Sequence, residues 1–226
     1  MVDSLGDRMK NNYENVTRNY LMKRTPVIMR IDGKAFHTLT RSCIKPFDDF
    51  LSESMIIAAK AVVKEAQGFK IAYIQSDEIS ILLTDYDTLE TSAWFDYNIQ
   101  KMCSVSASIA SVAFSNAFGR TAYFDCRVFN IPKEEVNNYF IWRQQDWMRN
   151  SIQMLARTHY SQKELDHKNV TKMHDMLFQK GINWSKLEPE KWKNGYTLFK
   201  SGTGVGSFIF RDKWDVMNEI IEVNHD

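Results

Sequence analysis

Short apolar runs alternate with longer segments of helical periodicity along the first two thirds of this chain. Runs rich in β-branched and aromatic residues predict strands over 27–32, 69–75, 79–84 and 121–131. Apolar residues at helical spacing predict helices over 45–68, 92–118 and 133–158. Up to residue 131 the order is β-α-β-β-α-β, which is that of the ferredoxin-like split βαβ motif. We therefore predict an α+β fold with the helices of this motif on one face of its sheet.

The remaining residues, 159–226, predict a mixed and less regular extension. Within it, "SGTGVGS" indicates a flexible hairpin, residues 208–214 a further strand, and residues 214–223 an amphipathic segment. No linker rich in proline, glycine or serine divides the chain. We expect a catalytic core over 1–131 with 132–226 packed on it, and the alternative of a single domain stays open.

The stretch "YIQSDEISILL" interrupts two apolar strands with Ser76, Asp77 and Glu78. Burying an unpaired carboxylate costs several kcal/mol, so we place these residues in a tight hairpin connection. The first strand ends at Asp32, and the first and third strands of a split βαβ sheet lie side by side, which brings Asp32 close to Asp77. Together with the Gly33 carbonyl, these carboxylates would form a hard-oxygen site suited to Mg²⁺.

Two Mg²⁺ ions held in this way would activate a hydroxyl and stabilise a pyrophosphate leaving group. The ordinary alternative stays open, because Asp-Gly turns end many strands and polar hairpins are common. The adjoining "DGKAFH" adds a turn whose backbone N–H groups, with Lys34 and His37, could cradle phosphate. Lys45, just before the first predicted helix, either reaches a triphosphate or is solvated.

Net charge, cysteine spacing and the lack of long apolar runs indicate which partners and which cell compartment to expect. The 226 residues carry a net charge of +1, so nucleic-acid binding would need local patches rather than overall charge. Three scattered cysteines without zinc-type spacing predict reduced thiols. The N-terminal segment lacks the apolar stretch of a secretion signal, and no run approaches the ~18 apolar residues that span a bilayer. We expect a soluble cytoplasmic protein without a membrane partner.

The third predicted helix presents a polar face. Arg143, Asp146 and Asn150 recur on one side of it, and Arg149 and Arg157 lie nearby. A solvated surface is the simpler interpretation, and an RNA-binding face is the alternative.

Several stretches in combination resemble the tRNA-His guanylyltransferase family, whose members are templated polymerases that add nucleotides in the 3′-to-5′ direction. The two most specific stretches are "MRIDGKAFHTLTR" and "AYIQSDEISILL". The others are "KPFDDF", "FDCRVFNIP", "YFIWRQQDWMRNSIQMLAR" and "LFKSGTG". The resemblance covers roughly residues 5–210 and implies a polymerase-type palm, which agrees with the predicted order of elements.

The resemblance implies an enzyme that activates a tRNA 5′ end with ATP or GTP, joins it to an incoming NTP, uses two Mg²⁺ ions and forms a homotetramer. It implies catalysis by Asp32, Asp77 and Glu78, with metal ligation by Asp32, Gly33 and Asp77. Implied nucleotide contacts are Asp32, Gly33, Lys34, Ala35, Phe36, His37, Lys45, Asp48, Ser76 and Asp77. Implied contacts to the RNA 5′ end or the triphosphate are Arg127, Arg143, Asp146, Asn150 and Lys200.

This chain departs from the family pattern at two places. Cys126 replaces the glycine of an "FDGR"-type strand. Met148 and Asn150 stand where eukaryotic members carry the histidine and first asparagine of a "HINN"-type motif. The second departure favours the "like protein" branch of bacteria and archaea, which resembles a tRNA 5′-end repair enzyme. Repair and tRNA-His-specific addition both stay open.

Two other classes remain as alternatives. A palm-fold nucleotide cyclase needs the same acids, metals and triphosphate, but it would not require the polar third helix. A non-catalytic RNA-binding protein would tolerate loss of the acids, whereas Asp32 and Asp77 are both present.

Overall fold

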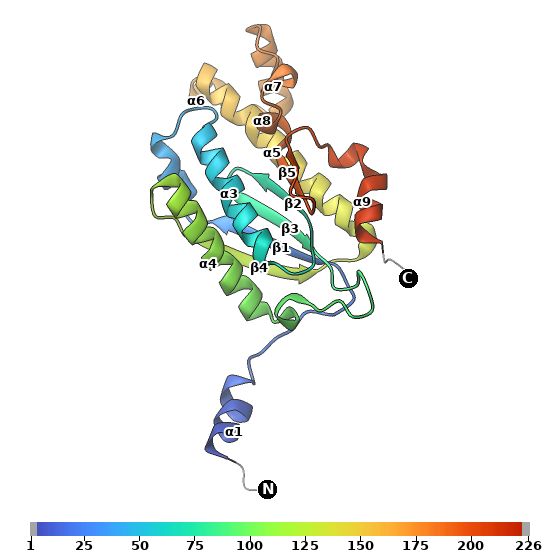
Figure 1. Cartoon of the computed structure of the whole chain (residues 1–226). Coiled ribbons are helices and arrows are strands. Elements are labelled where there is room, and N and C mark those ends of the chain that lie inside the picture. Colours follow the sequence, from blue (N-terminus) through green and yellow to red (C-terminus); the bar gives the residue numbers. More distant parts are fainter. Residues whose placement is uncertain (1–3, 223–226) are drawn as a thin grey trace.

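The computed structural model describes residues 4–222 (Figure 1). Its helices are α1 (Leu5–Met9), α2 (Phe36–Leu39), α3 (Asp49–Glu65), α4 (Ile99–Phe118), α5 (Lys133–His159), α6 (Gln162–Leu165), α7 (Val170–Gln179), α8 (Lys191–Asn194) and α9 (Trp214–Ile221). Its strands are β1 (Val27–Gly33), β2 (Phe69–Gln75), β3 (Glu78–Leu83), β4 (Phe124–Asn130), β5 (Tyr196–Phe199) and β6 (Gly204–Val205). The predicted α+β class and the order of elements up to α5 are confirmed.

All strand pairs are antiparallel and form one sheet in the order β4-β1-β3-β2-β5-β6. β1 and β3 are neighbours near the centre, as the split βαβ motif predicts. The register places Asp32 of β1 opposite Glu78 of β3 on one side and opposite Asp125 of β4 on the other. Residues directly opposite in neighbouring strands share a face of the sheet, so the three carboxylates form one row across it.

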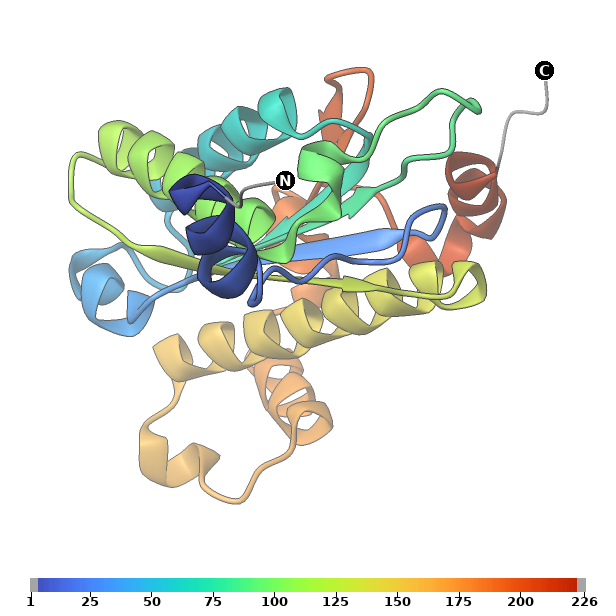
Figure 2. The ribbon, with the colours of Figure 1, turned by 90° about the horizontal axis from the view of Figure 1, so that it is seen from below.

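The sheet separates two apolar layers (Figure 2). Helices α3 and α4 cover one face, where alternate β1 residues such as Met29 and Ile31 are fully buried. Helices α5 and α9 cover the other face, where Ile28 of the same strand is buried. Successive strand residues point to opposite faces, which is why one short strand supplies both layers. The predicted motif helices thus share a face, and α5 together with part of the C-terminal extension covers the opposite one.

Beyond the sheet, the second half of α5 packs against α6 and α7 in a smaller apolar cluster that includes Leu155, Leu165 and Leu177. This part of the chain lies on the far side of α5 from the sheet (Figure 2). At the other end of the chain, α1 projects away from the sheet and helices (Figure 1), and Leu5 and Tyr13 are exposed there. No helix between residues 4 and 222 has the length and apolar character needed to cross a membrane.

Two helices begin later than their apolar periodicity predicted. α3 begins at Asp49 because Asp48 is its N-cap, so Pro46 lies before the helix rather than in its first turn. α4 begins at Ile99, where the Asn98 side chain accepts a hydrogen bond from the backbone N–H of Lys101 over 3.0 Å. Residues 94–97 form a separate short turn, so the predicted helix over 92–118 was too long at its start.

Predictions for the C-terminal extension were partly wrong. The hairpin predicted over 201–207 is present, because β6 lies within this stretch and pairs with β5 in an antiparallel manner. The strand predicted over 208–214 is absent from the described chain, where Phe210–Asp212 form a 3₁₀ turn and α9 begins at Trp214. The aromatic residues that suggested a strand are buried for another reason, since Phe208 and Phe210 pack under α5. Val223, the last residue of the predicted amphipathic segment, lies outside the described residues.

Candidate active site

A cavity of about 610 Å³ opens at the end of the sheet where β2 turns into β3. Its walls come from the β1–α2 turn, the segment before α3, the β2–β3 turn, α5 and the segment around α8. The predicted nucleotide-binding residues on its wall are Asp32, Gly33, Ala35, Phe36, His37, Lys45, Asp48, Ser76 and Asp77. A cavity of this size with convergent polar groups is typical of a small-molecule site.

Asp32 and Asp77 are brought together as the sequence predicted. The Gly33 N–H donates to the Asp77 carbonyl over 3.0 Å and ties the end of β1 to the β2–β3 turn. Burial raises the pKa of Asp32, and the nearby carboxylates of Asp77, Glu78 and Asp125 raise it further. Burial also raises the pKa of Asp77. The ion pairs found between residues 4 and 222 include neither Asp32 nor Asp77. The charge of Arg30 lowers the pKa of Asp32 by less than burial and the neighbouring acids raise it.

The backbone around the acids is unusual. Ala35 has φ of 56° and Ser76 has φ of 47°, a left-handed conformation that residues other than glycine seldom adopt. At Gly33, a Cβ atom would lie 2.3 Å from the Phe36 ring, so only glycine fits there without movement of that ring. Sparsely populated conformations cluster at ligand sites, where the surrounding structure holds them in place.

The segment before α3 is held by Asp48. Its two carboxylate oxygens accept backbone N–H groups of Leu51, over 2.9 Å, and of Ile44, over 2.8 Å. Lys45 is exposed, and its Nζ donates to the Thr40 carbonyl over 3.1 Å. Asp48 therefore shapes this wall of the cavity, while the Lys45 ammonium remains at its solvent side.

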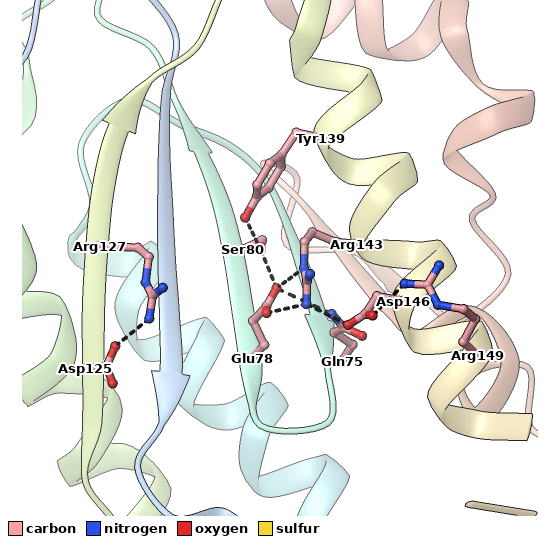
Figure 3. Close-up of polar contacts among 9 residues, drawn as sticks. All are labelled: Gln75, Glu78, Ser80, Asp125, Arg127, Tyr139, Arg143, Asp146 and Arg149. Carbon is pink, nitrogen blue, oxygen red and sulfur yellow. Dashed lines mark hydrogen bonds and ion pairs between the residues drawn. The ribbon is translucent and has the colours of Figure 1, made fainter. Parts of the chain in front are cut away.

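Glu78 follows Asp77 directly but has a different environment (Figure 3). It is the first residue of β3 rather than part of the turn, and it is 7% exposed. Arg143 of α5 binds its carboxylate in a bidentate manner, with Nε to Oε1 at 2.8 Å and Nη2 to Oε2 at 2.7 Å. The Ser80 hydroxyl donates to the same carboxylate over 3.0 Å. Glu78 and Arg143 thus neutralise each other beneath α5, and the wall of the cavity includes neither of them.

Asp146 continues this network outward along α5 (Figure 3). It accepts from Arg143 over 3.0 Å and from Arg149 over 2.8 Å. Asn150, predicted beside them, is exposed on the same helix. The polar face of α5 therefore has a buried part, where Arg143 is bound by carboxylates, and a solvated part that includes Arg149 and Asn150.

On the other side of Asp32, Arg127 of β4 lies opposite Arg30 of β1. Arg127 is exposed and approaches Asp125 at 3.4 Å (Figure 3). The Nε atom of Arg30 is buried and has no hydrogen-bond partner among the described residues. The sequence analysis did not single out Arg30, although its position two residues before Asp32 in a strand places both on one face.

The cavity wall lacks Lys34 and all five predicted contacts to the RNA 5′ end or the triphosphate, which are Arg127, Arg143, Asp146, Asn150 and Lys200. Lys200 forms an ion pair with Asp87 at 3.1 Å. Because β5 runs antiparallel to β2, Tyr196 lies beside the end of β2 near the cavity, and Lys200 is carried toward the opposite end. Lys34 is exposed in the β1–α2 turn but is absent from the cavity wall.

Comparison with known proteins decides the family. The family model described as tRNA-His guanylyltransferase matches residues 6–132. This chain belongs to the tRNA-His guanylyltransferase family. A bacterial tRNA-His guanylyltransferase-like protein solved in complex with ATP is 41% identical, with 98% of this chain and 100% of that chain covered and a TM-score of 0.92. The bacterial like protein solved in complex with GTP is 40% identical over the same shares, with a TM-score of 0.85.

A curated relative extends the comparison to eukaryotes. The tRNA-His guanylyltransferase of Debaryomyces hansenii is 28% identical over 207 residues, which is 80% of this chain and 76% of that protein. Relatives with this name are nucleotidyltransferases, so the family assignment fits the acidic cavity described above.

In this family member, a further part of the cavity wall comes from residues that were not among the predicted contacts. Phe47 stacks on Trp192 with ring centroids 5.0 Å apart, and Trp147 lies 6.3 Å from Phe47. Lys191 and Arg157 also line the cavity. The segment around α8 gave no periodic signal in the sequence, so its contribution could not be assigned there.

Members of the family generally use metal ions, and the acidic pair fits that requirement. Asp32 and Asp77 are oxygen donors on one cavity wall, both with raised pKa values. A divalent cation would relieve the cost of ionising them together. Between residues 4 and 222, no group of three or more His, Cys, Asp or Glu side chains is arranged for a metal ion. The two carboxylates are oxygen donors of the kind that hard divalent cations prefer.

Proposed function

We propose that this protein is a template-dependent nucleotidyltransferase that adds nucleotides to tRNA 5′ ends in the 3′-to-5′ direction, after activation of the end with ATP or GTP. The observation that carries the proposal is the acidic pair Asp32 and Asp77 on the wall of a cavity of about 610 Å³. The bacterial relatives bound to ATP and GTP, at about 40% identity, support a nucleotide as its occupant.

We also propose two Mg²⁺ ions as the cofactor. Asp32, Asp77 and the Gly33 carbonyl are the groups of this chain that would hold them. When bound, the ions would favour deprotonation of the attacking hydroxyl and neutralise the pyrophosphate that leaves. The protein's own task is then to hold the reacting groups in place, which is the main requirement of phosphoryl and nucleotidyl transfer.

The cavity offers distinct surfaces to the parts of a nucleotide. The β1–α2 turn supplies the backbone N–H groups of Ala35, Phe36 and His37, since those of Gly33 and Lys34 donate to protein carbonyls. Lys45 lies at the solvent side for a triphosphate. The stacked rings of Phe47 and Trp192 offer an apolar face for a base. Each of these contacts is tolerant of base identity, as a templated enzyme requires.

The charged groups around the cavity suit an RNA 5′ end. Arg30 and Arg127 lie opposite each other in neighbouring strands beside Asp32, and their positive charge suits a phosphate group. On α5, Asp146 and Asn150 offer polar contacts for RNA. Glu78 and Arg143 are positioning residues, because their ion pair fixes the start of β3 against α5.

Three finer points belong to the proposal. Met148 at the position of the family histidine favours repair of truncated tRNAs over addition to tRNA-His alone.

A homotetramer would spread tRNA contacts over several copies of a chain whose net charge is only +1, and the mass in solution from light scattering tests it. The cytoplasm is proposed as the compartment because its substrates, tRNA and nucleoside triphosphates, occur there together.

The test is extension of a 5′-monophosphorylated tRNA that lacks its first nucleotide, with Mg²⁺, ATP and all four NTPs. We expect one nucleotide to be added, and its identity to follow the opposing base when that base is exchanged in the tRNA. Asp32→Asn serves as the control for contaminating activity. Addition to tRNA-His without a template base, at a higher rate than repair, would contradict the repair assignment.

The same assay separates the alternative functions. Turnover of ATP or GTP in the absence of RNA, with a cyclic product, would identify a nucleotide cyclase. Binding of tRNA without incorporation, for both 5′-monophosphorylated and 5′-triphosphorylated substrates, would identify a non-catalytic RNA-binding protein.

A further inference from the structure

Cys103 of α4 and Cys126 of β4 meet on the face of the sheet opposite Glu78 and Arg143. Cys126 is paired with Ile31, which is fully buried in the layer under α3 and α4, so its side chain points toward α4. Cys103 lies in the N-terminal half of α4, and both cysteines lie on the wall of one cavity between α4 and β4. Neither residue belongs to the nucleotide cavity.

The two thiols are within reach of small molecules. Both line a second cavity of about 630 Å³, whose wall also includes Thr17, Gln100 and Ser104. Both cysteines are partly exposed rather than sealed in the core. A small oxidant can therefore reach the pair without unfolding of α4 or β4.

The local environment makes the two sulfurs unequal. The neighbouring Cys126 thiol and, to a smaller extent, the Val128 backbone N–H lower the pKa of Cys103 to about 7. The same contact raises the pKa of Cys126, which therefore stays a thiol. The thiolate is the nucleophilic form of cysteine, so Cys103 is the sulfur that reacts first. Cys43, which lies on the wall of the nucleotide cavity, has a pKa raised by burial instead.

A metal site is the competing use of two thiols, and the structure argues against it. Structural zinc needs four ligands from cysteine, histidine or carboxylate. Among residues 4–222, no set of three or more such side chains is arranged for a metal ion. Two neighbouring thiols without further ligands are suited to forming a disulfide with each other.

We propose that Cys103 and Cys126 form a reversible disulfide that links α4 to the edge strand β4 when the protein meets a peroxide. The Cys103 thiolate attacks one oxygen of hydrogen peroxide, the O–O bond breaks, and sulfenic acid and hydroxide form. The Cys126 sulfur then attacks the sulfenic sulfur and forms the S–S bond, and water leaves with the thiol proton. Each sulfur loses one electron overall, and the peroxide is reduced by two electrons.

The bond would fix a strand that borders the candidate active site. β4 directs Asp125 and Arg127 to the face that carries Asp32, while Cys126 between them points to the opposite face. β4 is an edge strand whose one neighbour in the sheet is β1. A covalent link to α4 would therefore give this edge a second attachment.

The test uses the full-length protein and hydrogen peroxide at pH 7, followed by alkylation of the denatured chain and peptide mapping by mass spectrometry. We expect alkylated thiols to fall from the three of the reduced chain to one, with Cys43 alkylated and a peptide pair linked through Cys103 and Cys126. Dithiothreitol should restore all three. Recovery of Cys103 and Cys126 both in alkylated form after oxidation would overturn the proposal.

Variants separate the roles of the two sulfurs. In Cys126→Ser, the sulfenic acid on Cys103 should persist and be trapped by dimedone. In Cys103→Ser, oxidation of Cys126 should be slower by tenfold or more. Cys43→Ser is the matched control and should still form the link. A linked dimer through Cys43, or equal peroxide reactivity in wild type and Cys103→Ser, would contradict the mechanism; the wild-type map decides the outcome even where a variant fails to fold.

Discussion

Helices bury both faces of the sheet, but the two faces differ in what is buried. Under α3 and α4 the contacts are apolar along the whole strand length, with the rings of Phe36, Phe114 and Phe124 clustered near the cavity end. Under α5 the layer is apolar at one end and charged at the other, where Glu78 meets Arg143. The first face is stabilised by apolar contacts, whereas the second also holds a buried ion pair that fixes the start of β3 against α5.

The contrast is sharpest between Asp77 and Glu78, which are adjacent in the chain. Glu78 has a bidentate partner and two further hydrogen-bond donors nearby, whereas Asp77 forms none of the ion pairs found in the described residues. A paired buried acid fixes structure, and an unpaired acid on a cavity wall is available to a cation. On this difference we propose Glu78 as a positioning residue and Asp77 as a catalytic residue.

The largest expected effect comes from Asp77→Asn. Loss of one of the two cation-binding carboxylates should reduce nucleotide addition by about 10⁴-fold, or about 5 kcal/mol of activation free energy. Because burial disfavours the charged form of Asp77, the same variant should unfold at an equal or higher temperature than wild type.

Single-turnover extension and thermal unfolding measure the two effects together. Asp125→Asn is the matched control, since Asp125 lies in the same acidic row but not on the cavity wall. Equal losses of activity in the two variants would remove the distinction drawn for Asp77.

Arg143→Met should reduce the free energy of unfolding by about 3–5 kcal/mol, because it leaves the Glu78 carboxylate buried without its cation. The double variant Glu78→Gln with Arg143→Met should recover most of that loss. Arg149→Met is the control, because Arg149 is 48% exposed and should contribute less than about 1 kcal/mol.

Urea unfolding of wild type, Glu78→Gln, Arg143→Met and the double variant measures the coupling between Glu78 and Arg143, with Arg149→Met unfolded beside them. A double variant as unstable as Arg143→Met alone would show that the loss comes from packing of the arginine side chain rather than from an unpaired charge.

Metal and pH should act on stability through Asp32 and Asp77. Both pKa values are raised above 3.8 in the folded protein. Between pH 3.8 and the raised values, the folded state therefore binds more protons than the unfolded state. Their contribution to stability should therefore be present at low pH and be lost as pH rises through the raised values. At neutral pH, Mg²⁺ at about 100 times its dissociation constant should restore about 2.7 kcal/mol.

Thermal unfolding with and without EDTA tests this linkage. The variant Asp32→Asn with Asp77→Asn should lose both the Mg²⁺ effect and this part of the pH dependence. A Mg²⁺ effect of wild-type size in that double variant would place the cation elsewhere.

The smallest effect tests the apolar face. Asn98→Ala removes the N-cap of α4 and should cost about 1 kcal/mol without changing turnover per folded molecule. Gln100→Ala, at an exposed position two residues later, should stay within about 0.5 kcal/mol. A marked loss of turnover in Asn98→Ala would show that α4 influences the site.

The sequence was most informative where a local pattern and a topological rule agreed. The strands around "YIQSDEISILL" have clear apolar runs, and the split βαβ order then brings Asp32 beside Asp77. Helix starts were less predictable, because apolar residues at helical spacing also occur before Asn98. The first turn of α4 is set by the Asn98 N-cap and not by that spacing. The partner of Glu78 could not be predicted, since Arg143 lies 65 residues away and both an RNA contact and an ion pair fit its position.

The C-terminal part of the wall escaped prediction for a related reason. Trp192 and Lys191 belong to a helix of only 4 residues, which is too short to give a periodic signal. Their place in the cavity is set by contacts with α5 and with the segment before α3, such as the Phe47 ring on Trp192. Contacts of this kind depend on how distant segments of the chain pack together, and the apolar periodicity of one segment does not predict them.

The row of Asp125, Asp32 and Glu78 across three strands restricts how the length of this chain can change. One inserted or deleted residue inside β1 would exchange Ile31 and Asp32 between the faces, and a carboxylate would then enter the aromatic cluster. Insertions should therefore be confined to connections, such as the segment between β3 and α4 or the one between α5 and α7. Those two places are where a tag, a fused domain or new chain termini could be introduced with the acidic row left intact.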